Sequence, residues 1–419
     1  MKFKNLVGIA GSILITTVCP LLAFAGTEGH GGEVVICPGQ QALMYDVYEA
    51  TAIREGLHLD LGPANLSAAQ KVKLALSRYA QRDPVRAARF QVKADAFLSE
   101  AKIGDFDLEP LTDANHIALP PHCTISQLID QREPELPGDK RYFISQRLWN
   151  QLNSDQMAVA ILHEIIYRLA IDMGQTDSVG SRALNSYIFS GKITSLSDKE
   201  YYDLLKATRF VTCGIGASSL AIYLQGYSVG AGGAFCPDFY DDGHLKSADL
   251  AVDNVIARAG SVDIPIHGSV TFYNDGHLAS AELASDNVMV KVGSIDIPIR
   301  GAVTLYDDGS FASLFISGSP AKIEFHGRML DLTEGVTFDE QGNLTSADLA
   351  TLTTLVVQNQ NVAFGSWIEF YPNGSVKSGR IFATQRLRNT QGRLVTIKVS
   401  PGDDELVKFD QNGLVLDRP

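Results

Sequence analysis

The sequence predicts an α+β protein in which a mostly helical N-terminal domain precedes an antiparallel β-repeat meander. Two observations support this fold class. Apolar residues at helical spacing recur through the first half of the chain, whereas a short motif around a turn glycine recurs at nearly constant spacing through the second half.

Residues 1–25 are predicted to be a signal peptide. Lys2 and Lys4 precede an apolar run over residues 6–24, and Ala23-Phe-Ala25 fits the small-x-small pattern that signal peptidase cleaves. The run is close to the lower length limit for crossing a bilayer, so cleavage is favoured over a retained anchor. We therefore expect an exported protein with no transmembrane segment after cleavage.

A lipoprotein signal that uses Cys19 is an alternative interpretation of the same leader. Such signals need a small residue directly before the cysteine, and Val18 is a poor match for that position. Ordinary cleavage is therefore favoured, and it leaves residues 26–419, which is long enough for two domains.

The acidic balance of the chain excludes one class of partner. The formal net charge is −13, and within residues 234–419 we count 24 acidic and 14 basic residues. A surface of this sign does not collect nucleic acid or anionic lipid through a basic patch. We therefore expect a protein or a cell-envelope component as the partner, and no nucleic acid.

The four cysteines that follow the leader predict two disulfides, because an even count is typical of exported chains. Three pairings of Cys37, Cys123, Cys213 and Cys236 are open. We favour Cys37–Cys123 within the first domain and Cys213–Cys236 at the junction, where a short loop would contribute roughly 3 kcal/mol. The spacings match neither a zinc finger nor a CxxC redox motif.

The first domain is expected to span residues 26–209 and to be mostly helical. A short strand is expected at residues 33–37, and residues 104–122 are expected to be irregular. A helical stretch or loop is expected after Cys123. Residues 210–233 are rich in glycine and are predicted to connect the two domains.

Start and stop signals locate the helices of this domain. Ser67 suits an N-cap, and Asp83 followed by Pro84 suits the first turn of another helix. The strongest helix is expected to start at Ser154. The expected helices cover residues 42–56, 67–80, 83–101, 154–173, 181–189 and 197–208.

A repeat around turn glycines is expected to span residues 234–419. The segment Phe239-Tyr-Asp-Asp-Gly-His-Leu returns as Phe272-Tyr-Asn-Asp-Gly-His-Leu. Asx-Gly between alternating apolar residues is typical of hairpins, since glycine adopts the positive φ of tight turns. Each unit is expected to supply two hairpins, with four short strands, to one long antiparallel sheet. The turn glycines fall at positions 243, 276, 309, 342, 374 and 413.

The motifs Phe239-Tyr-Asp-Asp-Gly, Phe272-Tyr-Asn-Asp-Gly and Phe370-Tyr-Pro-Asn-Gly resemble the Tyr-x-x-Gly core of MORN-like repeats in bacterial exported and antitoxin-type proteins. The resemblance covers roughly the second half of the chain. The period is longer than is usual in that family, and Asp339 and Asp410 replace the tyrosine in two units. The resemblance implies an interaction module or a membrane-surface module.

Two further segments, Gly31-Gly-Glu-Val-Val-Ile-Cys37 and Leu162-His-Glu-Ile-Ile-Tyr-Arg-Leu169, are followed by Thr176-Asp-Ser178. In these segments the first domain resembles the N-terminal region of uncharacterised exported proteins of Gram-negative bacteria. The resemblance implies a periplasmic, secreted or outer-surface location in such a bacterium, and it implies no particular activity.

His163 and Glu164 are the residues of the first domain that suggest chemistry. A His-Glu-x-x-His helix binds zinc through two imidazoles on one face, and its glutamate acts on the metal-bound water. Tyr167 stands where the second histidine would be. A zinc-dependent hydrolase, with His163 as metal ligand and Glu164 as catalytic group, is therefore the alternative function.

Such a hydrolase needs further ligands from elsewhere, and the chain offers Asp172, Asp177, His30, His116 and His122. The competing interpretation is that the histidine and glutamate bond to arginines or backbone groups and hold the fold. We favour this structural interpretation, and with it we expect no cofactor.

Four tyrosines are the candidate binding residues of the repeats. Alternation places one aromatic of each Phe-Tyr pair inward and its neighbour outward, so the tyrosines could form a ladder for glycan or protein. Cross-strand packing between units is the alternative. The Asp-Asp-Gly turns lack the full ligand string of a calcium loop, so ordinary turn chemistry is favoured there. The tyrosines are Tyr240, Tyr273, Tyr306 and Tyr371.

Together these observations favour an exported, non-enzymatic binding or scaffolding protein of the periplasm or cell surface. Repeat arrays build extended faces rather than deep pockets, which supports binding over catalysis. A purely structural component of the envelope is a third class that the sequence leaves open.

Overall fold

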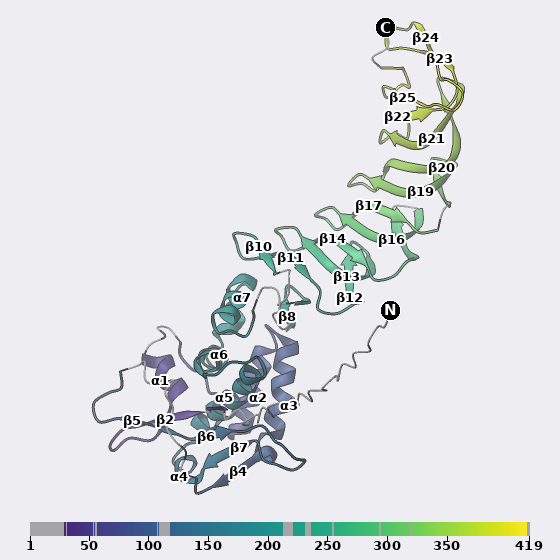
Figure 1. The fold of residues 1–419 in the computed structure, drawn as a ribbon. Coiled ribbons are helices and arrows are strands. Elements are labelled where there is room, and N and C mark those ends of the chain that lie inside the picture. The colour runs from purple at the N-terminus through teal and green to yellow at the C-terminus, as the bar shows by residue number, and fades with distance from the viewer. Residues whose placement is uncertain are drawn as a thin grey trace, which may run out of the picture.

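The computed structural model has helices in the first half of the chain and a long antiparallel sheet in the second half, which confirms the predicted α+β class (Figure 1). The predicted signal peptide and Cys19 lie outside the described residues. The structure describes residues 29–30, 32–52, 54, 57–106, 108, 118–212, 221–230, 236–253, 255–292, 295–318 and 320–416.

Seven α-helices occur among the described residues of the first half, and side chains cap several of them. Ser67 accepts a hydrogen bond from the Gln70 amide, and Asp83 caps the next helix, as the sequence predicts. Asn153 rather than Ser154 caps the strongest helix. The helices are α1 (Tyr45–Ala52), α2 (Ala68–Tyr79), α3 (Pro84–Glu100), α4 (Gln146–Trp149), α5 (Ser154–Asp172), α6 (Val179–Phe189) and α7 (Asp198–Ala207).

Two small sheets cover these helices, with strand orders β1-β6-β7-β4 and β3-β2-β5. The expectation of a helical stretch or loop after Cys123 is wrong, because strand β5 forms there. Its partner β2 lies far away in sequence, so local pattern could not reveal the pairing. The strands are β1 (Gly29–His30), β2 (Glu33–Ile36), β3 (Leu43–Met44), β4 (Ala101–Gly104), β5 (Thr124–Gln127), β6 (Ile129–Gln131) and β7 (Tyr142–Ser145).

The predicted disulfide Cys37–Cys123 is confirmed and joins the ends of β2 and β5, with Cα atoms 4.3 Å apart. It fixes the edge of the small sheet where the two strands meet. Cys236 is also disulfide-bonded. Cys213 lies outside the described residues, and so does the second predicted pairing.

The second half forms a 14-stranded sheet in which the paired strands are antiparallel and mostly close in sequence. The sheet extends from the helical part as a long curved arm (Figure 1). Its strands are β10 (Asp238–Phe239), β11 (Leu245–Asp249), β12 (Val255–Ala259), β13 (Val262–Phe272), β14 (Leu278–Leu283), β15 (Val288–Val292), β16 (Ile295–Leu305), β17 (Phe311–Ile316), β18 (Ala321–Phe325), β19 (Arg328–Phe338), β20 (Leu344–Val357), β21 (Gln360–Phe370), β22 (Val376–Ile381) and β25 (Glu405–Lys408).

The regular units contribute three strands each rather than the four that the sequence predicts. The last strand of one unit continues directly into the first strand of the next, as in β13 and β16. Gly268 and Gly301 lie within these strands at φ 63° and 65°, where the register shifts. The glycine forms a bulge instead of a break, so one long strand pairs with β12 along its first half and β11 along its second.

The second hairpin of a unit folds back so that its tip meets a later turn of the sheet. The Gly260 tip lies against Gly309, where an added Cβ would come within 2.9 Å of the Gly260 nitrogen. The Gln358 side chain donates to the Gly413 carbonyl at 2.7 Å. The repeat therefore has two layers, with its apolar side chains between them.

A short hairpin inside the predicted connector makes the same contacts. It consists of β8 (Ala221–Leu224) and β9 (Tyr227–Gly230), and its tip residue Gln225 donates to the Gly276 carbonyl at 3.0 Å. The Ser228 carbonyl accepts from Ala251, as the Pro265 carbonyl does from Ala284 in the next unit. This hairpin thus acts as a half-unit that begins the array.

Helix α7 stacks on the first unit and closes that end of the array. The Lys199 amide donates to the Gly243 carbonyl at 3.1 Å, and the rings of Tyr202 and Phe239 lie 5.4 Å apart. Most buried apolar residues of the helices and of the large sheet form one continuous cluster. Within the described residues no helix is both long and apolar enough to cross a membrane.

Candidate functional site

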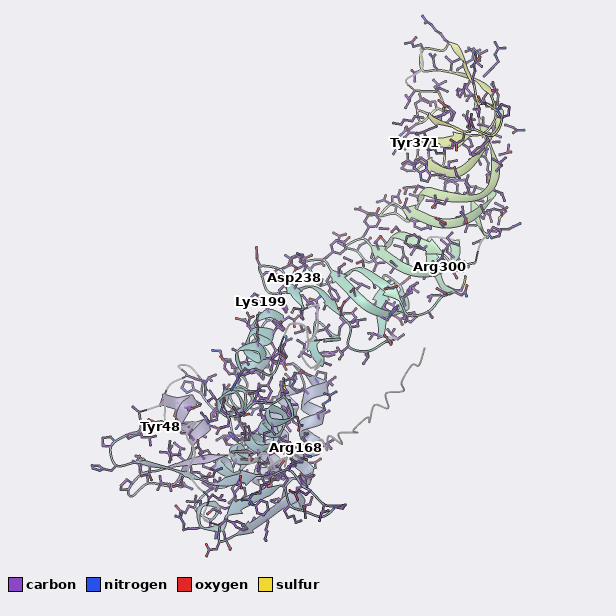
Figure 2. All side chains as sticks on the ribbon, viewed as in Figure 1. Tyr48, Arg168, Lys199, Asp238, Arg300 and Tyr371 are labelled. Carbon is purple, nitrogen blue, oxygen red and sulfur yellow. A yellow bond between two sulfur atoms is a disulfide. The ribbon has the colours of Figure 1, made fainter. Side chains whose placement is uncertain are left out.

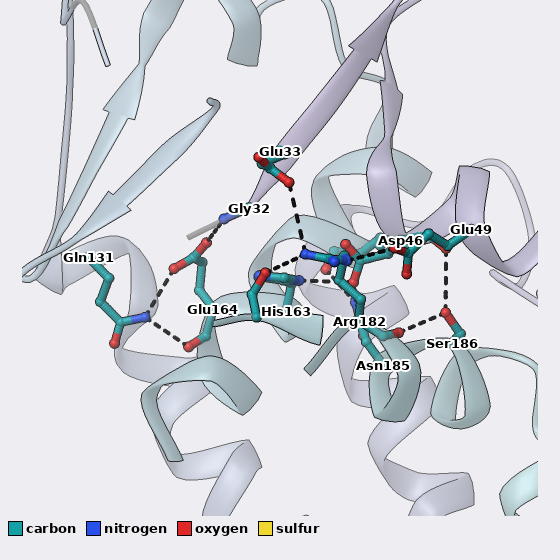
Figure 3. A network of polar contacts seen from close by, with 12 residues as sticks. Gly32, Glu33, Asp46, Glu49, Gln131, His163, Glu164, Arg182, Asn185 and Ser186 are labelled. Carbon is teal, nitrogen blue, oxygen red and sulfur yellow. Dashed lines mark hydrogen bonds and ion pairs between the residues drawn. The ribbon is translucent and has the colours of Figure 1, made fainter. Parts of the chain in front are cut away.

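His163 and Glu164 lie on α5, where the small sheets cover the helix, and both are fully buried (Figure 3). An amphipathic helix would place these two side chains at the border of its polar face, but that expectation is wrong because strands pack over that side of the helix. A histidine and a glutamate can occupy such a place only if partners satisfy them.

Asp46 on α1 is the partner of His163. Its Oδ2 lies 3.0 Å from His163 Nδ1 and also accepts from the Asn185 amide at 2.7 Å. Burial alone would lower the pKa of His163, but the charge and hydrogen bond of Asp46 outweigh burial and raise this pKa to about 9. The imidazolium and carboxylate therefore form a buried ion pair near neutral pH.

Glu164 turns away from that pair towards the strands. Its Oε1 accepts from the Gly32 amide, and its Oε2 accepts from Gln131 Nε2 at 3.0 Å. Burial raises the pKa of Glu164 to about 7, although these hydrogen bonds and the nearby His163 oppose the rise. A Cβ at Gly32 would lie 3.3 Å from Glu164 Oε1, so glycine lets the strand approach the carboxyl closely.

Arg182 on α6 links two further buried acids to the same network. Its Nε donates to Glu49 at 3.0 Å, and its Nη1 donates to Ser178 at 2.6 Å. Nη1 also lies 3.9 Å from the Glu33 carboxylate, and the guanidinium stacks over Tyr45. The network therefore joins α1, α5, α6 and β2 (Figure 3).

The described residues do not fit a zinc centre. No group of three or more His, Cys, Asp or Glu side chains in the described part of the chain is arranged to hold a metal ion. Nδ1 of His163 is hydrogen-bonded to Asp46, and Nε2 of His163 has no hydrogen-bond partner among the described residues. Tyr167 is buried beside His163, with ring centroids 6.1 Å apart.

The additional ligands that the hydrolase would need form ion pairs elsewhere, are exposed, or lie outside the described part. Asp172 lies 3.7 Å from Lys93, and Asp177 pairs with Arg209. His122 is exposed. His116 and the side chain of His30 are not among the described residues.

The tyrosines of the repeats bond from each unit to the next. Tyr240, Tyr273, Tyr306 and Tyr371 are half-buried, and each hydroxyl donates to the carbonyl of the inward residue that begins the following turn. The distances from hydroxyl to carbonyl oxygen lie between 2.7 and 2.9 Å. The structure thus gives these side chains a packing role, and Tyr371 lies on the turn edge of the array (Figure 2).

The aspartates of the turns also serve the backbone. Asp242, Asp275 and Asp308 each accept from the amide two residues later, which is ordinary Asx-turn geometry. Asp339, which replaces a tyrosine, accepts from two amides of its own turn. One tyrosine bond between units is therefore missing at that point.

Two apolar pairs on the outer face were not recognised from the sequence. Ile256 pairs with Pro265, and Met289 pairs with Pro298 at the same position of the next unit. Ile256 is 62% exposed and Met289 58%. The alternation of apolar and polar residues in this strand already places Pro298 on the solvent-facing side, and this pattern could have revealed the outer apolar pairs.

The third unit differs at this position, where the cross-strand pair is Lys322 and Asp331, 3.9 Å apart. A charged pair is thus compatible with the same backbone, and the repeat does not need apolar residues here for folding.

Comparison with models of protein families gives no match, and no curated protein is significantly similar to this chain. The resemblance to MORN-like repeats therefore stays a prediction.

Proposed function

We propose that this chain is an exported, non-enzymatic binding or scaffolding protein whose β-array holds a protein or cell-envelope component of the periplasm or cell surface. The observation that carries the proposal is the outer apolar surface, defined by Ile256, Pro265, Met289 and Pro298. Exposed apolar side chains on a rigid sheet are typical of interaction sites.

Three features support this proposal. The third unit replaces the apolar pair with an ion pair, so the apolar surface has no evident role in folding. The tyrosine hydrogen bonds stiffen the array, and a preorganised surface loses less entropy on binding. The resemblance to MORN-like repeats also implies an interaction or membrane-surface module.

Substituting the chain's own third-unit residues into the first two units tests the proposal. The variant carries Ile256→Lys, Pro265→Asp, Met289→Lys and Pro298→Asp. A photo-crosslinking amino acid at Phe315, 48% exposed on a neighbouring strand, reports contact in cells that export the protein. We expect a discrete crosslinked product with the native surface and none with the variant, while circular dichroism stays unchanged.

The same reporter at Leu136, 68% exposed on the helical part, is the matched control. Equal crosslinking from both positions, or a product that survives the four substitutions, would refute the proposal. Glu164→Gln should leave the product unchanged, since the buried network takes no part in binding.

A further inference from the structure

A cavity of about 550 Å³ lies apart from the buried network and from the outer apolar surface, between α3, the end of α5 and strand β8. Its volume falls within the range of roughly 300–1,000 Å³ that is typical of small-molecule sites. Apolar side chains form most of the wall, and Val92 among them is 71% exposed. The apolar lining includes Val85, Phe90, Val92, Leu169 and Met173.

Positive charge gathers on one side of this cavity, although the whole chain carries −13. Arg86, Arg89 and Lys93 lie on successive turns of α3 and line the cavity together with one acid, Asp172. An anion would therefore find here a local field opposite in sign to that of the protein as a whole.

Arg86 is the most deeply buried of these three cations. The residue is only 4% exposed, and its Nη1 has no hydrogen-bond partner among the described residues. The carboxylate of Asp83 lies 3.6 Å from its Nε. The Nη1 atom is itself buried, so Arg86 adds positive charge behind the cavity wall rather than a free donor inside the cavity.

The surroundings of Lys93 also favour a bound anion. Burial lowers the pKa of Lys93, and the neighbouring Arg168 guanidinium lowers it further, while Asp172 at 3.7 Å only partly compensates. A bound anion would offset this repulsion between cations.

We propose that the cavity binds an anionic amphiphile, with its single acyl chain against Val92, Leu169 and Met173. Its headgroup lies at Arg89 and Lys93, with the charge of Arg86 behind them. Apolar walls with cations on one side match both ends of such a molecule. The site is independent of the proposed partner surface, because the two lie on different parts of the chain.

Calorimetric titration of the purified mature chain with decanoate, below its micelle concentration, tests the proposal. We expect saturable one-to-one binding of decanoate, no binding of acetate, and about tenfold weaker binding of decanol, which lacks the charge. Lysophosphatidic acid distinguishes a lipid phosphate from a free carboxylate as the preferred headgroup. Equal affinity for decanol and decanoate, or no saturable binding of any anionic amphiphile, would overturn it.

Two exposed residues of α3 provide a matched pair of variants. Val92→Glu puts a carboxylate into the cavity and should abolish decanoate binding. Leu98→Glu makes the same change on the same helix outside the cavity lining, at a residue that is 62% exposed, and should leave binding unchanged. Because both side chains face solvent, both variants should keep the native circular dichroism. Native affinity in Val92→Glu would refute the assigned site.

Discussion

Removing the tyrosine hydroxyls of the repeats should weaken the array without changing its shape. In Tyr273→Phe the ring remains and only the bond to the Leu305 carbonyl, 2.7 Å long, is lost. The net value of such a bond is about 1 kcal/mol, since water competes for both groups in the unfolded chain. Because each bond joins a different pair of units, replacing all four tyrosines should cost about 4 kcal/mol.

Urea denaturation followed by circular dichroism measures this loss as a lower midpoint. Tyr223→Phe is the control, because that tyrosine lies in β8 and its hydroxyl forms no hydrogen bond among the described residues. A fourfold variant with the midpoint of the native protein would refute the idea that these bonds hold neighbouring units together. A loss equal to that of the control would refute it as well.

The carboxyl of Glu164 keeps its proton in the folded state up to a pKa of about 7, so the native protein loses stability as pH rises from about 4.5 to 7. Glu164→Gln removes this titrating group and should flatten the pH dependence of stability in that window. Asp46→Asn should cost about 3 kcal/mol at pH 7, because burial then lowers the pKa of His163 and the imidazole loses both its proton and its carboxylate partner. The contribution of that pair is complete below pH 6.5 and should disappear as pH rises through about 9, which urea midpoints across pH will show. Gly309→Ala should lower the melting temperature more than Gly392→Ala, because both have positive φ but only the first brings a Cβ against backbone.

Local chemistry made much of the helical part predictable. Ser67 and Asp83 cap the helices that they were expected to cap, because a side-chain oxygen near free amides acts within a few residues. The strand at residues 124–127 was not predictable, because it pairs with β2 across a separation that no sequence window covers.

At the candidate site too, the sequence pointed to individual residues but not to their contacts. The sequence singled out His163 and Glu164 as an unusual pair, but it contains no sign that Asp46, Gly32 and Gln131 would meet them. These partners come from a helix and from strands that are brought together only by folding. Their burial and altered pKa values follow from that assembly.

For the array, the turn glycines and the alternation of apolar residues were enough to predict antiparallel hairpins, since turn conformation and strand periodicity are properties of neighbouring residues. The continuity of β13 through Gly268, the half-unit around Gln225 and the bonds from Tyr240 to the next unit were decided by tertiary structure. Each of these features depends on distances between units, and distances across a fold are set by how whole layers pack. The sequence therefore determined the repeating element, and the packing of the layers determined which surfaces remain exposed.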